Sequence, residues 1–337
     1  METLLEGGSF FEGPRWHEGR WWVSDFYRHV VLTVDPDGTA SEVMTVDAQP
    51  SGLGWMPDGS LLVVSMRDRM VLRCDPGGAF TVHADLAELC GGHANDMVVD
   101  ASARAYVGNF GFDLMGGADP APAALIRVDP DGSATVVAED LLFPNGSVIT
   151  PDGRTLIVGE TAGARYTAFT IGEDGALSDR RVWAQMAPTP EIGGTLEQTL
   201  GQLQFGPDGC ALDAEEHIWS ADSMGARAAR VASGGEIVDE IRAPDGLGVF
   251  ACMLGGDDGR TLLLCCAPDF DEHARSLARE AVLLTASVDV GHAGLPSRGA
   301  LCAFLRHRGR SSSAGRACTT PSSRSRSSWR RGWPRCG

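Results

Sequence analysis

Residues 150–160 read TPDGRTLIVGE, a tight turn followed at once by a run of β-branched and long apolar side chains. Proline presets φ for the first central position of a turn, aspartate hydrogen-bonds the nearby backbone, and glycine accepts a positive φ. The apolar run that follows is typical of a β-strand. This stretch therefore predicts a hairpin turn that leads into a strand.

The same combination returns along the chain. The turn motif occurs as VDPDG (34–38), MPDGS (56–60), VDPDG (128–132), GPDGC (206–210) and DDGRT (257–261). Units that resemble one another begin near residues 12, 52, 95, 145, 208 and 248. Short strands of alternating apolar residues, in six units of about 40–60 residues, match the four-stranded blades of a β-propeller. We therefore expect an all-β fold, one six-bladed β-propeller.

The composition agrees with a turn-rich fold. The 337 residues include 43 glycines and 18 prolines, which favour many turns over long helices. Each blade of a propeller buries its faces against its neighbours, so we expect residues 1–296 to form a single domain. The only helix that we expect is a short one at 274–280.

Charge divides the chain into two parts. Residues 297–337 hold ten of the 28 arginines and none of the 45 acidic residues; residues 1–296 keep 18 arginines, a net charge of −27. The Arg/Ser-rich tail at 297–337 has no hydrophobic period, and we expect it to be disordered or to derive from a shifted reading frame. The acidic body would repel phosphate groups, so we expect no nucleic acid and no membrane as a partner.

No targeting segment is recognisable. Residues 1–8 are acidic and lack the basic and apolar regions of a signal peptide. No uncharged apolar run approaches the roughly 18 residues of a membrane span. The expected location is therefore cytoplasmic, and the sequence does not indicate the oligomeric state.

Polar residues occur at the starts of four predicted blades, in apolar surroundings. They are Glu12 in FFEGPRW, Asn95 in GHANDMVVD, Asn145 in LLFPNGSVIT and Asp208 in QFGPDGCALD. The innermost strands of a propeller line a central channel, where side chains from different blades become neighbours. Carboxylate and amide oxygens suit Ca²⁺ or Mg²⁺, or the borderline ions Mn²⁺ and Zn²⁺. These residues indicate a central metal-binding channel.

Each of these residues also has a purely structural interpretation. Glu12 could simply begin a strand, and Asn145 could belong to an ordinary Asn-Gly turn. Asp208 could belong to one more PDG turn, since the same motif elsewhere in the chain predicts only a turn. The motifs decide between the interpretations as an ordered set.

EGPRW (12–16), HAND (93–96), PNG (144–146) and PDGCALDAEEHIW (207–219) occur in that order. With these motifs, roughly residues 8–295 resemble the SMP-30/gluconolactonase/LRE-like family, which includes regucalcin and gluconolactonases. The resemblance implies a six-bladed propeller with one divalent metal ion in the channel, Ca²⁺ first and Zn²⁺, Mn²⁺ or Mg²⁺ as alternatives.

The resemblance also implies roles for single residues. Glu12, Asn145 and Asp208 match the positions of the family's metal ligands, and Asn95 matches a residue that faces the substrate. His93 stands where many relatives carry another polar residue, which leaves the recognition of polyols open. His93 could contact the substrate or serve as an acid or base at neutral pH.

Two further groups of residues adjoin these motifs. Asp96 and Asp213 could orient the ligands or serve in turns and on the surface. Phe110, Phe112 and Met224 follow inner strands and could form an apolar rim that favours a substrate less polar than an aldonolactone, although packing alone explains each of them singly.

The predicted function is a metal-dependent hydrolase of lactones, a carboxylic ester hydrolase with a small-molecule lactone as its substrate. A metal ion would polarise the lactone carbonyl, and a water activated by Asp208 or His93 would attack it. The alternatives are a phosphotriesterase-like hydrolase of the same fold and a non-catalytic propeller that binds a metal or metabolite. No GxSxG, GxxxxGK[ST] or GxGxxG motif competes with this interpretation.

Overall fold

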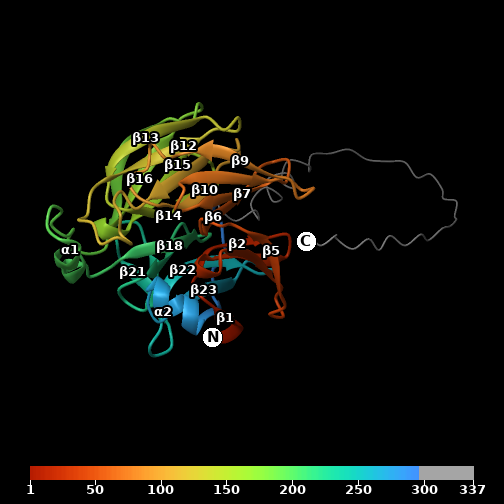
Figure 1. Cartoon of the computed structure of the whole chain (residues 1–337). Helices are drawn as coiled ribbons and strands as arrows, with labels where there is room; N and C mark the ends of the chain where they lie inside the picture. Colours follow the sequence, from red (N-terminus) through yellow and green to blue (C-terminus); the bar gives the residue numbers. More distant parts are fainter. Residues whose placement is uncertain (296–337) are drawn as a thin grey trace, which may run out of the picture. The chain divides into compact units, whose positions relative to one another are not determined.

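Six four-stranded antiparallel sheets form the fold of the computed structural model, which describes residues 1–295 (Figure 1). The first three sheets are β2 (Phe11–His17), β3 (Arg20–Asp25), β4 (Val30–Val34), β5 (Ala40–Thr45); β6 (Pro50–Trp55), β7 (Leu61–Ser65), β8 (Met70–Cys74), β9 (Phe80–Asp85); and β10 (Ala94–Val99), β11 (Ala105–Asn109), β12 (Ala123–Val128), β13 (Ala134–Leu141). The predicted six-bladed β-propeller is confirmed. The predicted tail at 297–337 lies outside the described residues.

The other three sheets include the one that closes the ring. Their strands are β14 (Pro144–Ile149), β15 (Thr155–Glu160), β16 (Arg165–Ile171), β17 (Leu177–Gln185); β18 (Pro207–Leu212), β19 (Ile218–Asp222), β20 (Arg227–Val231), β21 (Ile237–Arg242); and β22 (Gly248–Gly255), β23 (Thr261–Ala267), β24 (Ala281–Ser287) with β1 (Glu2–Gly8). β1 pairs antiparallel with β24, from Glu2 opposite Thr285 to Gly8 opposite Ala281. The N-terminal strand thus completes the last blade, which joins the two ends of the propeller and shields the edge of β24.

The inner strands form a closed ring in which each contacts the next. The order is β2, β6, β10, β14, β18 and β22, and β22 also contacts β2. Every residue of β10, β14 and β18 is buried, whereas every residue of the outer strands β5 and β21 is at least partly exposed. The expected alternation of buried and exposed residues is therefore wrong for the inner strands. Both faces of an inner strand are covered by neighbouring blades, so both faces are apolar or hold the polar groups of the channel.

The PDG segments separate into two kinds. Five of them, including 34–38 and 150–154, lie in the turns between consecutive strands, as predicted. The sixth, 206–210, lies largely within β18 and forms no such turn. Asp208 therefore stands on an inner strand and not at the tip of a hairpin.

Two short helices interrupt the strands. α2 (Glu272–Ala278) lies close to the helix predicted at 274–280, and α1 (Leu196–Gln202) was not predicted. Two single-turn 3₁₀ helices, η1 (Phe26–Arg28) and η2 (Thr161–Gly163), follow β3 and β15. Among the described residues, no helix is long and apolar enough to span a membrane.

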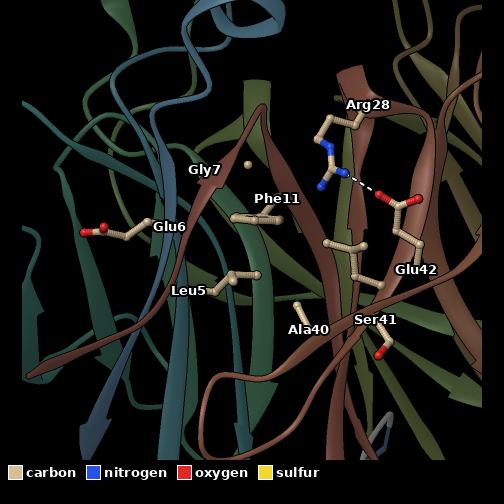
Figure 2. A pocket seen from close by; sticks show the side chains of 10 residues that line it. Leu5, Glu6, Gly7, Phe11, Arg28, Ala40, Ser41 and Glu42 are labelled. Carbon is tan, nitrogen blue, oxygen red and sulfur yellow. Dashed lines mark hydrogen bonds and ion pairs between the residues drawn. The ribbon is translucent and has the colours of Figure 1, made fainter.

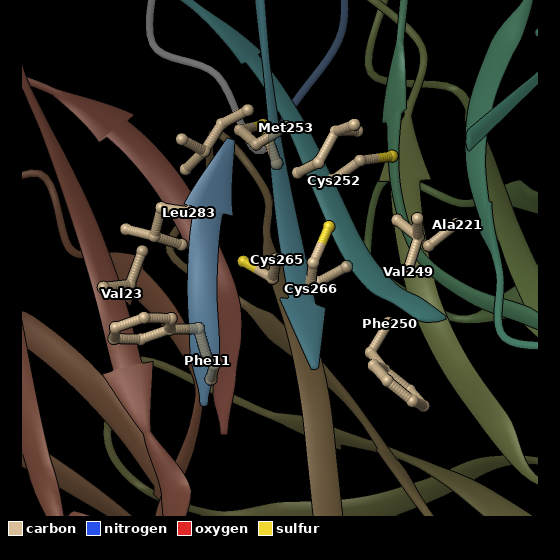
Figure 3. Close-up of a cluster of buried hydrophobic side chains, with 14 of the residues drawn as sticks. Phe11, Val23, Ala221, Val249, Phe250, Cys252, Met253, Cys265, Cys266 and Leu283 are labelled. Atoms are coloured by element: carbon tan, nitrogen blue, oxygen red, sulfur yellow. The ribbon is translucent and has the colours of Figure 1, made fainter. Parts of the chain in front are cut away.

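The largest apolar cluster fills the seam where the ring closes. Figure 3 shows Phe11 and Val23 of the first blade beside Leu283 of β24, with Cys266 of β23 nearby. These side chains are almost completely buried. Burial of apolar side chains stabilises a fold by about 1.5–3 kcal/mol each, so this seam holds the first and last blades together.

A cavity opens at the same seam, on its outer side. Figure 2 shows it between β1 and the first blade, lined by Leu5, Phe11 and the ion pair of Arg28 with Glu42. Arg28 already has its carboxylate partner there. None of the predicted site residues lines this cavity.

Candidate active site

Four polar residues from four blades line one pocket. Glu12, Asn95, Asn145 and Asp208 are each the second residue of an inner strand, namely β2, β10, β14 and β18. Because the blades repeat, equivalent positions on successive inner strands come to the same level of the channel. All four residues are buried. The structure therefore brings together the residues that the sequence motifs singled out.

Three of these residues are each followed by a glycine, for a steric reason. A Cβ on Gly146 would lie 2.3 Å from the carbonyl oxygen of Asp208, and one on Gly13 would lie 2.6 Å from that of Ser51. A Cβ on Gly209 would lie 2.6 Å from the nearest atom of the next inner strand. Real Cβ atoms do not approach so closely, so no side chain fits where adjacent inner strands meet. The polar residue faces the pocket and the glycine faces the next blade.

Asn145 and Asp208 belong to adjacent blades and contact each other. The Nδ2 amide of Asn145 donates to Oδ1 of Asp208 at 2.6 Å and to Oγ1 of Thr161 at 3.1 Å. The Thr161 hydroxyl in turn donates to the carbonyl of Pro207 at 2.6 Å. The amide nitrogen of Asn145 is thus occupied, which leaves the amide oxygen as the atom that can bind a ligand in the pocket.

The two carboxyl groups of the site have little compensating positive charge. Burial raises the pKa of Glu12 well above its ordinary value, and the nearby Asp208 raises it further. Burial also raises the pKa of Asp208, although the hydrogen bond from Asn145 acts in the opposite direction. Two buried carboxyl groups that oppose each other's ionisation form a site that a cation would stabilise.

The donor chemistry fits a divalent cation. Two carboxylates and one amide supply only oxygen atoms, which are the ligands that Ca²⁺ and Mg²⁺ take in proteins. Within residues 1–295, no three His, Cys, Asp or Glu side chains are grouped so that they could hold a metal ion. A metal at this site would therefore need the oxygen of Asn145 beside Glu12 and Asp208.

A buried ion pair lies next to the carboxyl groups. The guanidinium of Arg15 donates to Oδ1 of Asp96 at 2.7 Å and to the carbonyls of Leu53 and Met97 at 2.9 Å and 2.7 Å. Arg15 is 2% exposed. The charge of Arg15 is matched by Asp96, which explains why it only weakly offsets the effects that raise the pKa of Glu12.

The second acid that adjoins the motifs has a different role. Asp213 accepts hydrogen bonds from Nε of Arg230 at 2.6 Å and from the backbone amide of His217 at 3.0 Å. Asp213 does not line the pocket. It stabilises the turn between β18 and β19, so the structural interpretation of this residue is correct.

Asn95 and His93 lie in the same pocket wall. Oδ1 of Asn95 accepts a hydrogen bond from the hydroxyl of Ser51 at 3.2 Å, which leaves the amide nitrogen to meet a ligand. His93 is partly exposed, and its ring centroid lies 5.6 Å from that of Phe110. Burial, together with the nearby Arg67, lowers the pKa of His93, so the ring is neutral at pH 7. A neutral ring can accept a proton.

The rest of the pocket wall is mostly apolar, with Gln49, Thr161, Thr199 and Ser223 as its polar members. Phe110, Phe112 and Met224 line it, as the sequence suggested. The sequence interpretation missed most of the apolar wall: Phe10, Phe26, Tyr27, Met66, Leu114, Met115, Pro120, Phe143, Ala162, Leu196, Leu200, Leu203, Phe250 and Phe270. These residues come from loops and strands of several blades, so no local period marks them.

Helix α1 brings two of the missed apolar residues, Leu196 and Leu200, to the pocket. Its first turn is fixed by a capping box: the Thr195 hydroxyl accepts from the backbone amide of Gln198, and the Gln198 side chain accepts from the backbone amide of Thr195. This Thr-x-x-Gln pattern is a sequence signal for a helix start. It was the one local signal that could have revealed α1.

The sequence is similar to that of known lactonases. The family model described as "SMP-30/Gluconolactonase/LRE-like region" matches residues 10–267. The pentonolactonase XacC of Haloferax volcanii is 28% identical over 213 residues, which cover 62% of this chain and 65% of that protein. The 6-deoxy-6-sulfogluconolactonase of Pseudomonas putida is 29% identical over 170 residues, or 50% and 52% of the two chains. The chain thus spans between half and two thirds of the length of these relatives.

The fold also matches solved structures. The crystal structure of a calcium-binding protein, regucalcin from Agrobacterium tumefaciens, has a TM-score of 0.70 with 20% sequence identity. The match covers 86% of this chain and 94% of that one. At this identity the likeness concerns the fold.

Proposed function

The chain belongs to the SMP-30/gluconolactonase/LRE-like family, and we propose that it is a metal-dependent hydrolase that opens lactones. The observation that carries the proposal is the meeting of Glu12, Asn145 and Asp208 at the buried end of one pocket. The pentonolactonase and the sulfogluconolactonase among the relatives support the reaction class.

Glu12, Asn145 and Asp208 would hold the metal ion through their oxygen atoms. The three oxygen donors suit Ca²⁺ and Mg²⁺, and the calcium-binding regucalcin among the similar structures supports Ca²⁺ as the first choice, with Mg²⁺, Mn²⁺ and Zn²⁺ as alternatives. When bound, a divalent ion supplies positive charge that polarises a carbonyl group and stabilises the oxyanion that forms from it. Burial disfavours the ionised forms of Glu12 and Asp208, and a bound cation would stabilise both carboxylates.

The chain's own residues supply orientation and a proton acceptor. The amide nitrogen of Asn95 is left to donate to the substrate, because Ser51 already occupies its oxygen. A water adds to the carbonyl carbon, its proton passes to Asp208 or His93, and the ring C–O bond then breaks. The alkoxide that leaves takes up a proton, so one lactone and one water become one hydroxy acid.

Two groups can accept the proton from the attacking water. Burial raises the pKa of Asp208 in the metal-free site, but a bound cation would favour its ionised form and make it a weaker base, and its Oδ1 is engaged by Asn145. His93 is neutral and open to the pocket. Replacing His93 with glutamine distinguishes the two candidates. If His93 is the base, kcat falls by about 100-fold or more and the acid limb of the pH–rate profile disappears.

The experiment that tests the function uses the full chain after removal of metal with EDTA. Hydrolysis of a six-membered lactone is followed in a pH-stat before and after addition of Ca²⁺, Mg²⁺, Mn²⁺ or Zn²⁺, with a phosphotriester as a second substrate. We expect lactone hydrolysis that one of these ions restores. Preference for the phosphotriester would indicate the related hydrolase activity. A metal-dependent rise in melting temperature without any turnover would indicate a non-catalytic metal-binding propeller.

A further inference from the structure

The charged groups of the pocket are all acidic. Of the side chains that line it, only Glu12 and Asp208 are carboxyl groups, and neither arginine nor lysine is among the described residues of the wall. The chain contains no lysine at all. Arg67, which lies near His93, is paired with Glu272. With the proposed divalent ion bound to Glu12 and Asp208, the polar end would carry no net charge, and no arginine of the described wall would pair with an anionic group elsewhere on the substrate.

Aromatic rings form two opposite parts of the wall. Phe10 contacts Phe26, Tyr27 and Phe250, with ring centroids 5.4, 5.6 and 4.8 Å away. These residues belong to the first and last blades and the segments that adjoin them. On the other side, the ring of Phe110 lies 4.5 Å from that of Phe143 and 5.6 Å from that of His93. Rings from distant parts of the chain thus enclose an apolar space above the four polar residues.

Some polar side chains of the wall are already occupied. The hydroxyl of Thr161 donates to the carbonyl of Pro207, and that of Ser223 donates to the carbonyl of Gly206 at 3.1 Å. Within the described wall, the hydroxyl of Thr199 and Nδ1 of His93 are buried and have no hydrogen-bond partner. Away from the polar end, Gln49, His93 and Thr199 are the polar groups of a wall that is otherwise mostly apolar or already hydrogen-bonded. Hydroxyl groups of a sugar lactone placed against that wall would lose their hydration largely without partners.

We propose that the substrate is a neutral lactone that carries an alkyl or aryl group, and not a sugar lactone or an anionic lactone. The inference rests on the proposed function and adds the substrate class. The ester group lies at the polar end, beside Glu12, Asn95, Asn145 and Asp208. The apolar group occupies the space between the aromatic rings. Each methylene that enters an apolar pocket of an enzyme changes kcat/KM by about 10- to 200-fold.

The test compares four δ-lactones with the same ring: glucono-δ-lactone, unsubstituted δ-valerolactone, δ-decalactone with its pentyl chain, and a δ-lactone with a carboxylate on its side chain. We expect kcat/KM for δ-decalactone to exceed that for glucono-δ-lactone by about 100-fold or more. The carboxylate lactone should be the poorest substrate. Preference for glucono-δ-lactone would overturn the inference and leave the lactonase function intact.

Binding without turnover separates the substrate class from the reaction. The lactams that correspond to δ-decalactone and glucono-δ-lactone are hydrolysed far more slowly, so calorimetry measures their affinity alone. We expect the pentyl lactam to bind at least about tenfold more tightly. If it does so while no lactone is hydrolysed, the apolar ligand class stands and the proposed function fails. Equal or weaker binding of the pentyl lactam would overturn the inference.

A variant at the pocket rim tests the role of charge. Met224 lines the pocket and is 46% exposed, so Met224→Arg adds a cation without disturbing the core. We expect it to raise kcat/KM for the carboxylate lactone by about tenfold and to lower that for δ-decalactone. Val82→Arg, at an exposed position on β9 that does not line the pocket, serves as the control. Equal effects of both variants would contradict the assignment of the apolar wall.

Discussion

The Nδ2 atom of Asn145 lies 2.6 Å from Oδ1 of Asp208 and joins the inner strands of the fourth and fifth blades. The hydrogen bond fixes the orientation of the amide, because the same nitrogen also donates to Thr161. It also lowers the pKa of Asp208 against the larger effect of burial. One contact therefore both orients an oxygen donor and keeps its carboxylate neighbour easier to ionise.

Replacement of Asn145 with alanine should weaken metal binding. The variant loses one oxygen donor and the hydrogen bond that favours the ionised form of Asp208, so we expect the dissociation constant for Ca²⁺ to rise about tenfold or more. Thr161→Ala is the matched control. It removes a hydrogen-bond partner of the same amide but none of the three side chains proposed to bind the metal ion. Calorimetric titration of both variants measures the difference. Equal loss in the two would show that the amide oxygen of Asn145 does not bind the ion.

Glu12→Gln should stabilise the metal-free protein at neutral pH, by about 1–3 kcal/mol, because it removes a buried carboxyl group whose ionisation is disfavoured by burial and by Asp208. Glu160→Gln should destabilise it by about 3–5 kcal/mol, since Glu160 is completely buried and is ion-paired with Arg165. Denaturant unfolding in EDTA measures both. A loss of stability in Glu12→Gln would contradict an uncompensated carboxyl pair.

The same comparison has a defined pH dependence. Because the folded state raises the pKa of Glu12, the folded protein binds this proton more tightly than the unfolded chain. The contribution of Glu12 to stability is therefore present at low pH and is lost as the pH rises through the raised pKa. The stability advantage of Glu12→Gln in EDTA should accordingly grow with pH above the ordinary carboxyl value of 4.5. A constant difference across this range would contradict the raised pKa.

Gly146→Ala should displace the fourth inner strand from the fifth. The new Cβ would lie 2.3 Å from the carbonyl oxygen of Asp208 and 2.8 Å from the backbone nitrogen of Cys210. We expect a loss of about 1–3 kcal/mol in the free energy of unfolding and a larger relative loss of metal affinity. Gly77→Ala should be nearly neutral, because no atom lies within 4 Å of its Cβ position. A stable, metal-binding Gly146→Ala variant would refute the close contact.

Arg15→Met should be strongly destabilising. It leaves Asp96 buried without its cation, close to two further carboxyl groups, and we expect a cost of about 3–5 kcal/mol. Arg242→Met removes an exposed ion pair with Glu240 and should cost less than about 0.5 kcal/mol. Urea unfolding of the two variants checks the contrast. Similar costs would mean that Arg15 is not the essential partner of Asp96.

The repeating turn motif was sufficient to predict six blades and their approximate starts. The closure of the last blade by β1 was not predictable in the same way, because pairing of Glu2–Gly8 with β24 depends on contacts across the whole chain. The inner strands also lack the expected alternation, since neighbouring blades bury both of their faces. Local patterns predicted the elements, and packing between blades decided the rest.

The polar part of the site was predictable and its apolar part was not. Glu12, Asn145 and Asp208 lie in short motifs, each with a glycine that the close contact between blades requires. Rings such as Phe10 and Phe250 are about 240 residues apart and meet only in the folded ring. The cytoplasmic location and the nature of the tail stay predictions.

The most direct test of the account compares two aspartates from the same motif. Asp208 lies in GPDGC on β18, and Asp152 lies in TPDGR at an exposed turn. With saturating metal, kcat/KM for δ-decalactone is measured for Asp208→Asn and Asp152→Asn in a pH-stat. We expect a loss of at least about 100-fold for Asp208→Asn and no significant change for Asp152→Asn. If Asp208→Asn hydrolyses the lactone like the wild type, the site is wrongly assigned.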